Sequence, residues 1–106
     1  MPKYLAACNY VGEGIKGLLK EGGSSRRASV EKLVGSMGGT VEAFYYAFGE
    51  TDLYIIADFP DNESMAAVAL VVAASGAIEI KTTVLLTPEQ VDEAVKKTPM
   101  YHPPGQ

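Results

Sequence analysis

Strand-like and helix-like patterns alternate along the chain. Four apolar runs, rich in β-branched and aromatic residues, predict strands over residues 4–10, 40–48, 53–59 and 77–86. The polar tetrapeptide at residues 49–52 joins the second run to the third. So short a connection predicts an antiparallel hairpin.

Between the first two predicted strands, the apolar residues have the spacing that is typical of helices. About one turn at residues 15–19 precedes a longer helix, whose apolar positions follow i, i+3, i+4 and i+7: Val30, Leu33, Val34 and Met37. We expect Ser24 or Ser25 to cap this helix. The pair Gly38-Gly39 should end it by adopting the left-handed conformation.

Two further helices are marked by their first residues. Asp61 can cap a helix over residues 63–75, which is rich in Ala and Val and ends before Gly76. Residues 87–90 (Thr-Pro-Glu-Gln) combine a cap, a proline at the first helical position and a capping-box glutamine. We therefore expect a short C-terminal helix to about Lys97, followed by a Pro-rich tail.

The resulting order is β-α-β-β-α-β with one more helix. This is the order of the ferredoxin-like fold, in which helices cover one face of a four-stranded antiparallel sheet. A length of 106 residues fits one domain. We expect a single α+β domain over residues 1–98 and a Pro-rich tail over residues 99–106.

The outer face of this sheet is expected to be too apolar for water. The period of two assigns to the helix-covered face Tyr4, Ala6, Cys8, Val41, Ala43, Tyr45, Leu53, Ile55, Ala57, Ile78, Ile80 and Val84. It assigns to the outer face Leu5, Ala7, Asn9, Phe44, Tyr46, Phe48, Tyr54, Ile56 and Leu85, among polar residues. We expect two copies, or a higher oligomer, to pack these faces together as a dimeric α+β barrel. Alternatively, the terminal helix folds back over part of the face.

Composition narrows the choice of partners and compartment. A net charge of −4 and a pI near 4.9 disfavour nucleic-acid binding. The longest apolar stretch, residues 65–74, is well short of the roughly 20 residues that cross a bilayer. The first residues lack the apolar core of a signal peptide. We expect a soluble cytoplasmic protein with no membrane partner.

Several short motifs occur together in the order and spacing of a known family. They are the strand at 4–10 followed by Gly14-Ile15-Lys16, the Gly38-Gly39 stop, Phe44-Tyr45-Tyr46, and Gly49-Glu50-x-Asp52 before an apolar strand and Pro60-Asp61. With these motifs the chain resembles the GYD domain family over residues 3–97. The resemblance implies a small bacterial protein, similar in shape to dimeric α+β barrel proteins, and implies no particular chemistry. Thr51 stands where the family's named motif has Tyr.

Three features suggest chemistry but also have structural explanations. Gly12-x-Gly14-x-x-Gly17 matches a dinucleotide-binding pattern, yet the chain is too short for paired nucleotide-binding halves, so a turn or a weak anion site is expected. Cys8 lies among apolar residues and is expected to be buried and unreactive. Five basic residues are expected to form a solvated helix face or to attract an anion: Lys16, Lys20, Arg26, Arg27 and Lys32.

The candidate ligand-binding residues come from strands, turn and tail. Asn9 and Tyr46 are expected to supply polar groups to a pocket on the outer face, beside Tyr54. Asp52 can orient a ligand or accept hydrogen bonds from the turn. His102, the only histidine, either is exposed or reaches a partner's pocket as a general base or haem ligand. One Cys and one His make a zinc site improbable, and no cofactor is expected.

Two functions fit these residues. The first is a homodimeric module that binds a small apolar or anionic ligand, or that mediates an interaction. The second is a cofactor-independent enzyme of the monooxygenase or isomerase type, with a pocket between sheet and helices or partner, suggested by analogy with dimeric barrel proteins. A cavity lined by Asn9, Tyr46 and Tyr54 would favour a ligand or a substrate, whereas a solid interface would favour a structural role.

Overall fold

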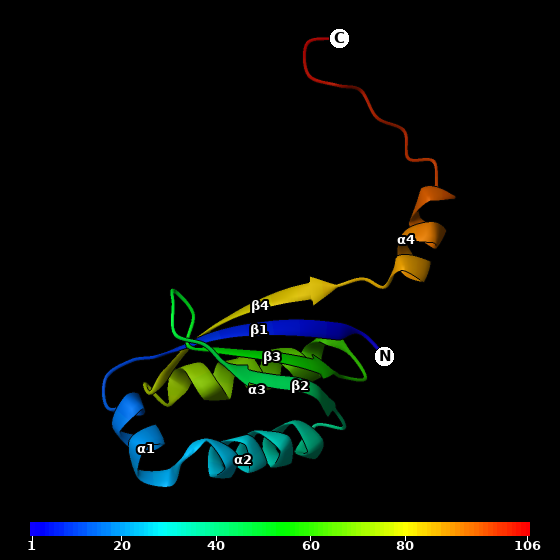
Figure 1. Cartoon of the computed structure of the whole chain (residues 1–106). Helices are drawn as coiled ribbons and strands as arrows, with labels where there is room; N and C mark the ends of the chain where they lie inside the picture. The colour runs from blue at the N-terminus through cyan, green and yellow to red at the C-terminus, as the bar shows by residue number, and fades with distance from the viewer.

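A computed structural model describes all residues, 1–106, and shows an α+β chain with one sheet (Figure 1). The strands are β1 (Lys3–Tyr10), β2 (Thr40–Tyr46), β3 (Leu53–Asp58) and β4 (Ile78–Leu85). Their order in the sheet is β2-β3-β1-β4, and every neighbouring pair is antiparallel. The helices are α1 (Gly14–Glu21), α2 (Gly23–Ser36), α3 (Asn62–Ala74) and α4 (Pro88–Val95). The expected α+β class and four-stranded antiparallel sheet are confirmed.

The helix boundaries follow their capping residues, with one exception. Asp61 accepts a hydrogen bond from Ser64 N at 2.8 Å, and Thr87 forms the expected capping box with Gln90. Gly38 ends α2 with a φ of 75°. The expectation that Ser24 or Ser25 caps α2 is wrong. The helix begins at Gly23 after Gly22, whose φ of 84° turns the chain directly from α1 into α2.

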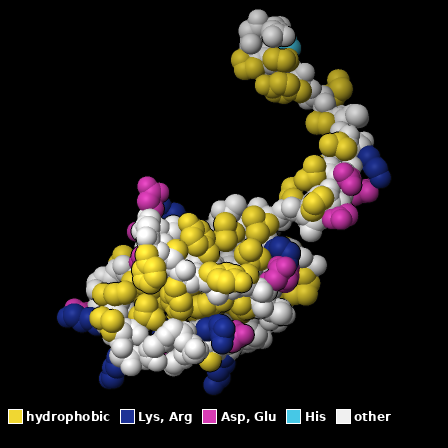
Figure 2. Space-filling view, in the orientation of Figure 1, with side chains coloured by type: hydrophobic (Ala, Val, Ile, Leu, Met, Phe, Trp, Pro, Cys, Tyr) yellow, Lys and Arg dark blue, Asp and Glu magenta, His cyan; other side chains and the backbone are white.

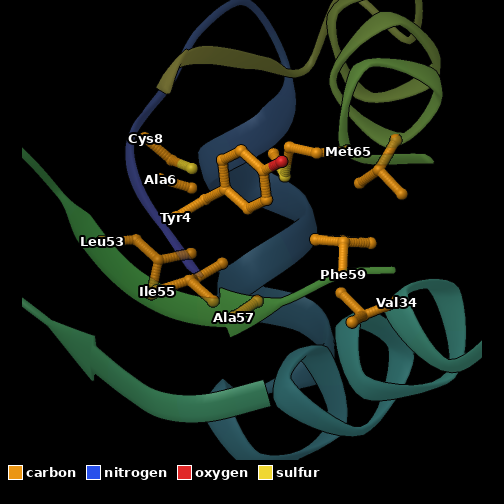
Figure 3. Close-up of a cluster of buried hydrophobic side chains, with 10 residues drawn as sticks. Tyr4, Ala6, Cys8, Val34, Leu53, Ile55, Ala57, Phe59 and Met65 are labelled. Carbon is orange, nitrogen blue, oxygen red and sulfur yellow. The ribbon is translucent and has the colours of Figure 1, made fainter. Parts of the chain in front are cut away.

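The core lies on one face of the central strands β1 and β3 (Figure 3). Tyr4, Ala6 and Cys8 alternate as buried residues along β1, and so do Leu53, Ile55 and Ala57 along β3. Val34 from α2 and Met65 from α3 cover them. The Tyr4 ring packs edge-on against Phe59, with the ring centroids 5.9 Å apart. The face assignment predicted for β1 and β3 is therefore confirmed.

Strand β2 does not follow its predicted alternation. Val41 pairs with Ala57, but Ala43 pairs with Ile56, so Glu42 is the extra residue of a β-bulge. The bulge reverses the faces of every later residue in the strand. Phe44 and Tyr46 pack against the core, while Tyr45 is exposed on the outer face. The predicted faces of Ala43, Phe44, Tyr45 and Tyr46 are thus wrong.

The outer face of the sheet remains largely apolar after this exchange. The register places there Leu5, Ala7, Ala43, Tyr45, Tyr54, Ile56 and Leu85. Figure 2 shows hydrophobic side chains gathered over the sheet and bordered by charged ones. At one end of this face Lys3 forms ion pairs with Glu42 and with Asp58, and the two hydrogen bonds raise the pKa of Lys3.

Helix α4 and the residues after it stand away from the rest of the molecule (Figure 1). Every residue of α4 is exposed, so the helix does not fold back over the outer face. The molecule consequently measures 57 × 33 × 23 Å, with a radius of gyration of 16.9 Å. None of its helices combines the length and the apolar character that crossing a membrane requires.

Candidate functional site

A pocket of about 410 Å³ opens at the end of the sheet where β1 terminates. Helix α1 forms one wall, and the loop between β2 and β3 forms the other. Seven of the nine lining residues are hydrophobic; the full set is Tyr10, Ile15, Leu18, Leu19, Gly23, Tyr46, Ala47, Phe48 and Asp52. Its volume lies within the range of roughly 300–1,000 Å³ that is usual for small-molecule sites.

Tyr46 is held in this pocket by the start of α2. Its hydroxyl donates a hydrogen bond to the carbonyl oxygen of Gly23 at 3.1 Å. A Cβ atom on Gly23 would lie 2.9 Å from Tyr46 Cε2, so only glycine leaves room for the ring. The ring also packs edge-on against Phe44, with the centroids 5.4 Å apart. The pocket wall is therefore set by the bulge of β2 and by the Gly22-Gly23 turn together.

Tyr10 supplies a second phenol to the same pocket. Burial, and after it the neighbouring Tyr46 phenol, raises the pKa of Tyr10 to about 12, whereas Arg26 opposes the shift. Tyr10 is therefore a neutral hydrogen-bond donor throughout the physiological range. Arg26 itself is half-buried, and its Nη1 lies 3.8 Å from Glu21 Oε1. Two phenols thus line one apolar pocket, and a guanidinium outside the lining lies near enough to influence Tyr10.

Asp52 joins the hairpin loop to the end of β1. Its Oδ2 accepts a hydrogen bond from Tyr10 N at 3.0 Å. Its own N–H donates to Cys8 O at 3.0 Å and to Asn9 Oδ1 at 2.9 Å. The carboxylate therefore positions Tyr10 and borders the pocket at the same time. The partners of its carboxylate and of its N–H lie on β1, whereas its carbonyl oxygen accepts from Ala47 N at 2.8 Å within the loop.

A smaller cavity of about 100 Å³ lies inside the core, between the sheet and helices α2 and α3. Of its 17 lining residues 15 are hydrophobic, and Arg26 and Ser29 are the polar exceptions. Cys8 lines this cavity, and burial raises the pKa of its thiol to about 11. A thiol in such surroundings is a weak nucleophile. Arg26 adjoins this cavity and also influences Tyr10 in the larger pocket.

The five candidate residues from the sequence do not form one site. Asp52 and Tyr46 both line the larger pocket, although Tyr46 reaches it from the helix-covered side of the sheet. Asn9 lies behind the pocket, where its side chain holds Asp52. Tyr54 lies on the outer face opposite Tyr45. His102 is exposed in the tail after α4, beyond the opposite end of β4.

Sequence reasoning did not assign Tyr10 to the site, and it missed the approach of Arg26 to this residue. Tyr10 was available as the last residue of a strand that runs into a glycine-rich turn, a common position for binding residues. Arg26 was grouped with the solvated basic residues, and the helix break at Gly22 brings it to the end of the sheet. Phe48, expected within a strand, instead lies fully exposed in the loop at the pocket rim.

The glycine pattern at residues 12–17 has a packing explanation. A Cβ atom on Gly14 would lie 2.0 Å from Ala77 O, so α1 can begin against this carbonyl only with glycine. Gly12 has a φ of 53°, which turns the chain out of β1. A Cβ atom on Gly17 would meet nothing closer than 3.9 Å. The pattern therefore serves the β1–α1 turn.

Comparison with known proteins agrees with the motifs. No curated protein and no solved structure gives a significant match to the chain. A family model described as the GYD domain matches residues 4–95, which include the sheet, all the pocket residues and α4. The chain belongs to the GYD domain family.

Proposed function

We propose that this protein is a homodimeric module of the ferredoxin-like type that binds one small, mostly apolar molecule in the pocket of each chain. The observation that carries the proposal is the pocket itself. Seven of its nine lining residues are hydrophobic, and its polar side-chain groups are few: the two phenols and the Asp52 carboxylate. Few polar groups in an apolar cleft are what orients a small ligand.

The polar groups at the pocket define the chemical class of the ligand. Tyr10 is a neutral phenol there, and Arg26 brings a positive charge close to it. Both groups are hydrogen-bond donors. The ligand therefore carries an acceptor oxygen, either a carbonyl or a carboxylate, on an apolar body that contacts Ile15, Leu18 and Phe48.

The outer face of the sheet supports the proposed dimer. Tyr54 and Ile56 of β3 lie there beside Leu5 and Ala7 of β1, with Tyr45 of β2 exposed next to Tyr54. Contiguous exposed apolar surface of this kind marks interaction sites. Two sheets packed face to face lie about 10 Å apart, which allows these rings to interdigitate. The strand order β2-β3-β1-β4 is consistent with the ferredoxin-like type.

The ligand proposal can be tested with 8-anilinonaphthalene-1-sulfonate, an apolar fluorophore that carries an anionic acceptor. We expect a saturable fluorescence increase with one probe molecule per chain. Ile15→Arg places a charge in the pocket wall and should weaken binding at least about tenfold. Val11→Arg is the matched control, because Val11 is exposed nearby and does not line the pocket. Equal loss in both variants, or no saturable binding, would contradict the proposal.

The dimer proposal is tested by sedimentation of a variant altered on the outer face. Tyr54→Glu introduces a charge at an exposed position, so the chain should fold and sediment as a monomer. Thr82→Glu is the control, because Thr82 is exposed on the other face of the sheet and should leave the dimer intact. A dimer that tolerates Tyr54→Glu would exclude the outer face as the interface.

A cofactor-independent enzyme is a second candidate, favoured by the position of Asp52. Its carboxylate lines the same pocket as the phenols of Tyr10 and Tyr46. A carboxylate can take a proton from a substrate while a phenol stabilises the resulting oxyanion. Native mass spectrometry of the purified protein would identify a bound molecule to use as substrate. Loss of its conversion in Asp52→Asn, with binding preserved, would support the enzyme.

A further inference from the structure

The C-terminal arm, residues 86–106, contains helix α4 but does not pack against the rest of its own chain. Its helix α4 carries an apolar stripe of Val91, Ala94 and Val95, and all three are exposed. Figure 2 shows hydrophobic side chains along the arm as it leaves the body. An isolated helix of eight residues is only marginally stable in water. The stripe therefore requires a surface to cover it.

The chain exposes more surface than a compact monomer of its mass, and the excess is large enough for a stable interface. The accessible surface of the chain is 7368 Å². A compact monomer of 11.2 kDa exposes roughly 5,700 Å², so the excess is roughly 1,700 Å². Each partner in an interface of standard size contributes only about 800 Å². The radius of gyration of 16.9 Å likewise exceeds the value of about 13 Å expected for this length.

The connection to β4 directs the arm away from its own body. Only Leu86 and Thr87 separate β4 from α4. Thr87 is extended, with a ψ of 159°, and its capping box with Gln90 holds that entry into the helix. The two hydrogen bonds of the box measure 2.8 and 3.1 Å. The cap therefore fixes how the chain enters α4, and the short connection leaves Leu86 alone to reorient the helix.

Helix α3 presents the apolar surface that matches the stripe. Leu70 and Val71 are exposed on it, together with the small residues Ala66, Ala73 and Ala74. No charged residue follows Glu63 in this helix. A helix that is apolar on all sides is normally buried. Helix α3 packs beside β4, the strand from whose end the arm departs.

We propose that α4 of one copy packs against the exposed ridge of α3 in a second copy, with Val91 and Val95 covering Leu70 and Val71. A two-fold axis makes the contact reciprocal, so each arm clasps the other chain. Lys96, directly after the helix, then remains in water at the rim, as do the charged residues of α4: Glu89, Asp92 and Glu93. The inference rests on the proposed dimerisation of the chain, does not require the outer-face contact, and is independent of the ligand.

Disulfide trapping tests the contact directly. Chains carrying Val95→Cys are mixed with differently tagged chains carrying Leu70→Cys and mildly oxidised, while the buried Cys8 stays reduced. We expect the mixed disulfide to exceed by at least about tenfold that formed with Lys20→Cys, an exposed residue of α1. Equal yields in the two mixtures would overturn the contact. So would a bond formed only within chains that carry both substitutions.

The dissociation constant of the dimer provides a second measurement. Val95→Glu should raise it at least about tenfold, because it places a charge in the covered stripe. Lys96→Gln makes the same change of net charge outside the stripe and should leave it within about twofold. A chain ending at residue 87 should dissociate more readily than either variant.

The outcomes separate this inference from the proposed outer-face dimer. If Tyr54→Glu disrupts the dimer and Val95→Glu does not, the arm contact is wrong and the outer-face dimer stands. If Val95→Glu disrupts it and Tyr54→Glu does not, the outer-face dimer is wrong and the arm contact stands. A full-length chain that sediments as a monomer would overturn both.

Discussion

The ring of Tyr46 lies 2.9 Å from where a Cβ atom on Gly23 would be, and its hydroxyl donates to the carbonyl of the same residue at 3.1 Å. One residue of α2 thereby limits the position of a pocket side chain and accepts its hydrogen bond. Tyr46 belongs to an edge strand, where its packing against Phe44 and its contact with Gly23 both restrain it. The packing of this pair determines the shape of the pocket.

Gly23→Ala should displace Tyr46 and destabilise the chain by about 1–3 kcal/mol, because the added methyl group would lie 2.9 Å from the ring. Urea unfolding measures the loss, and the fluorophore binding described above should weaken with it. The control is Gly35→Ala in the same helix, where a Cβ atom meets nothing within 4 Å. That change should stabilise by up to about 1 kcal/mol. Equal effects would show that the Tyr46 contact is unimportant.

Substitutions of two glycines in the pattern at residues 12–17 should have different effects on stability. Gly14→Ala should cost several kcal/mol or prevent folding, because its Cβ would overlap the Ala77 carbonyl at 2.0 Å. Gly17→Ala should be neutral or stabilising, because the nearest atom lies at 3.9 Å on the flexible Glu21 side chain. Thermal unfolding of the two variants checks this difference. Similar losses at both positions would contradict the packing explanation of the pattern.

The Cys8 thiol should be unreactive in the folded protein. Burial raises its pKa to about 11, so about one molecule in a thousand carries a thiolate at pH 8. We expect a disulfide reagent such as Ellman's reagent to modify Cys8 only as urea unfolds the chain. Ser25→Cys, on the exposed surface of α2, should react at once and serves as the control. Rapid modification of Cys8 in native buffer would contradict its burial.

Stability at alkaline pH should depend on Tyr10. Its pKa is about 12 in the folded chain and 10.0 without the surrounding structure. Between these values the unfolded chain has lost a proton that the folded chain keeps, so the free energy of unfolding falls as pH rises from 10 to 12. Tyr10→Phe should reduce this decline, as measured by urea unfolding at each pH. Tyr101→Phe, in the exposed tail, should leave it unchanged.

The capping hydrogen bond of α3 should make the free energy of unfolding depend on pH in the acidic range. The hydrogen bonds from Ser64 lower the pKa of Asp61 below 3.8, so the cap stabilises the fold above that pH and loses its effect as pH falls. Asp61→Asn keeps an acceptor at this position, so it should preserve the cap and remove its dependence on pH. Asp61→Ala should lower the urea midpoint at pH 7. Identical acid profiles in wild type and Asp61→Asn would exclude this role.

The elements of the fold were predictable because each has a local signal. The capping residues Asp61 and Thr87 and the stop at Gly38 act within one helical turn, and the structure shows all three. The faces of β1 and β3 follow simple alternation because both strands are regular. The direct turn from α1 to α2 through Gly22 removed the need for a serine cap.

The site was harder to predict because it depends on contacts between distant segments. The bulge at Glu42 arises from the pairing of β2 with β3, and the composition of β2 contains no sign of it. The bond from Tyr10 N to Asp52 joins residues 42 positions apart. Asp52 and Tyr46 were identified by residue type, whereas the contributions of Tyr10 and Arg26 depend on how the ends of two elements meet.

The single extra residue in β2 also affects how the family can diverge. A strand that kept Glu42 but lost the bulge would alternate strictly, so Tyr45 would enter the core while Phe44 and Tyr46 moved to the surface. The bulge thus decides whether Tyr46 serves the cavity beside α1 or the exterior of the sheet. Relatives that keep this length without the bulge should differ in what they bind, even where every aromatic ring is retained.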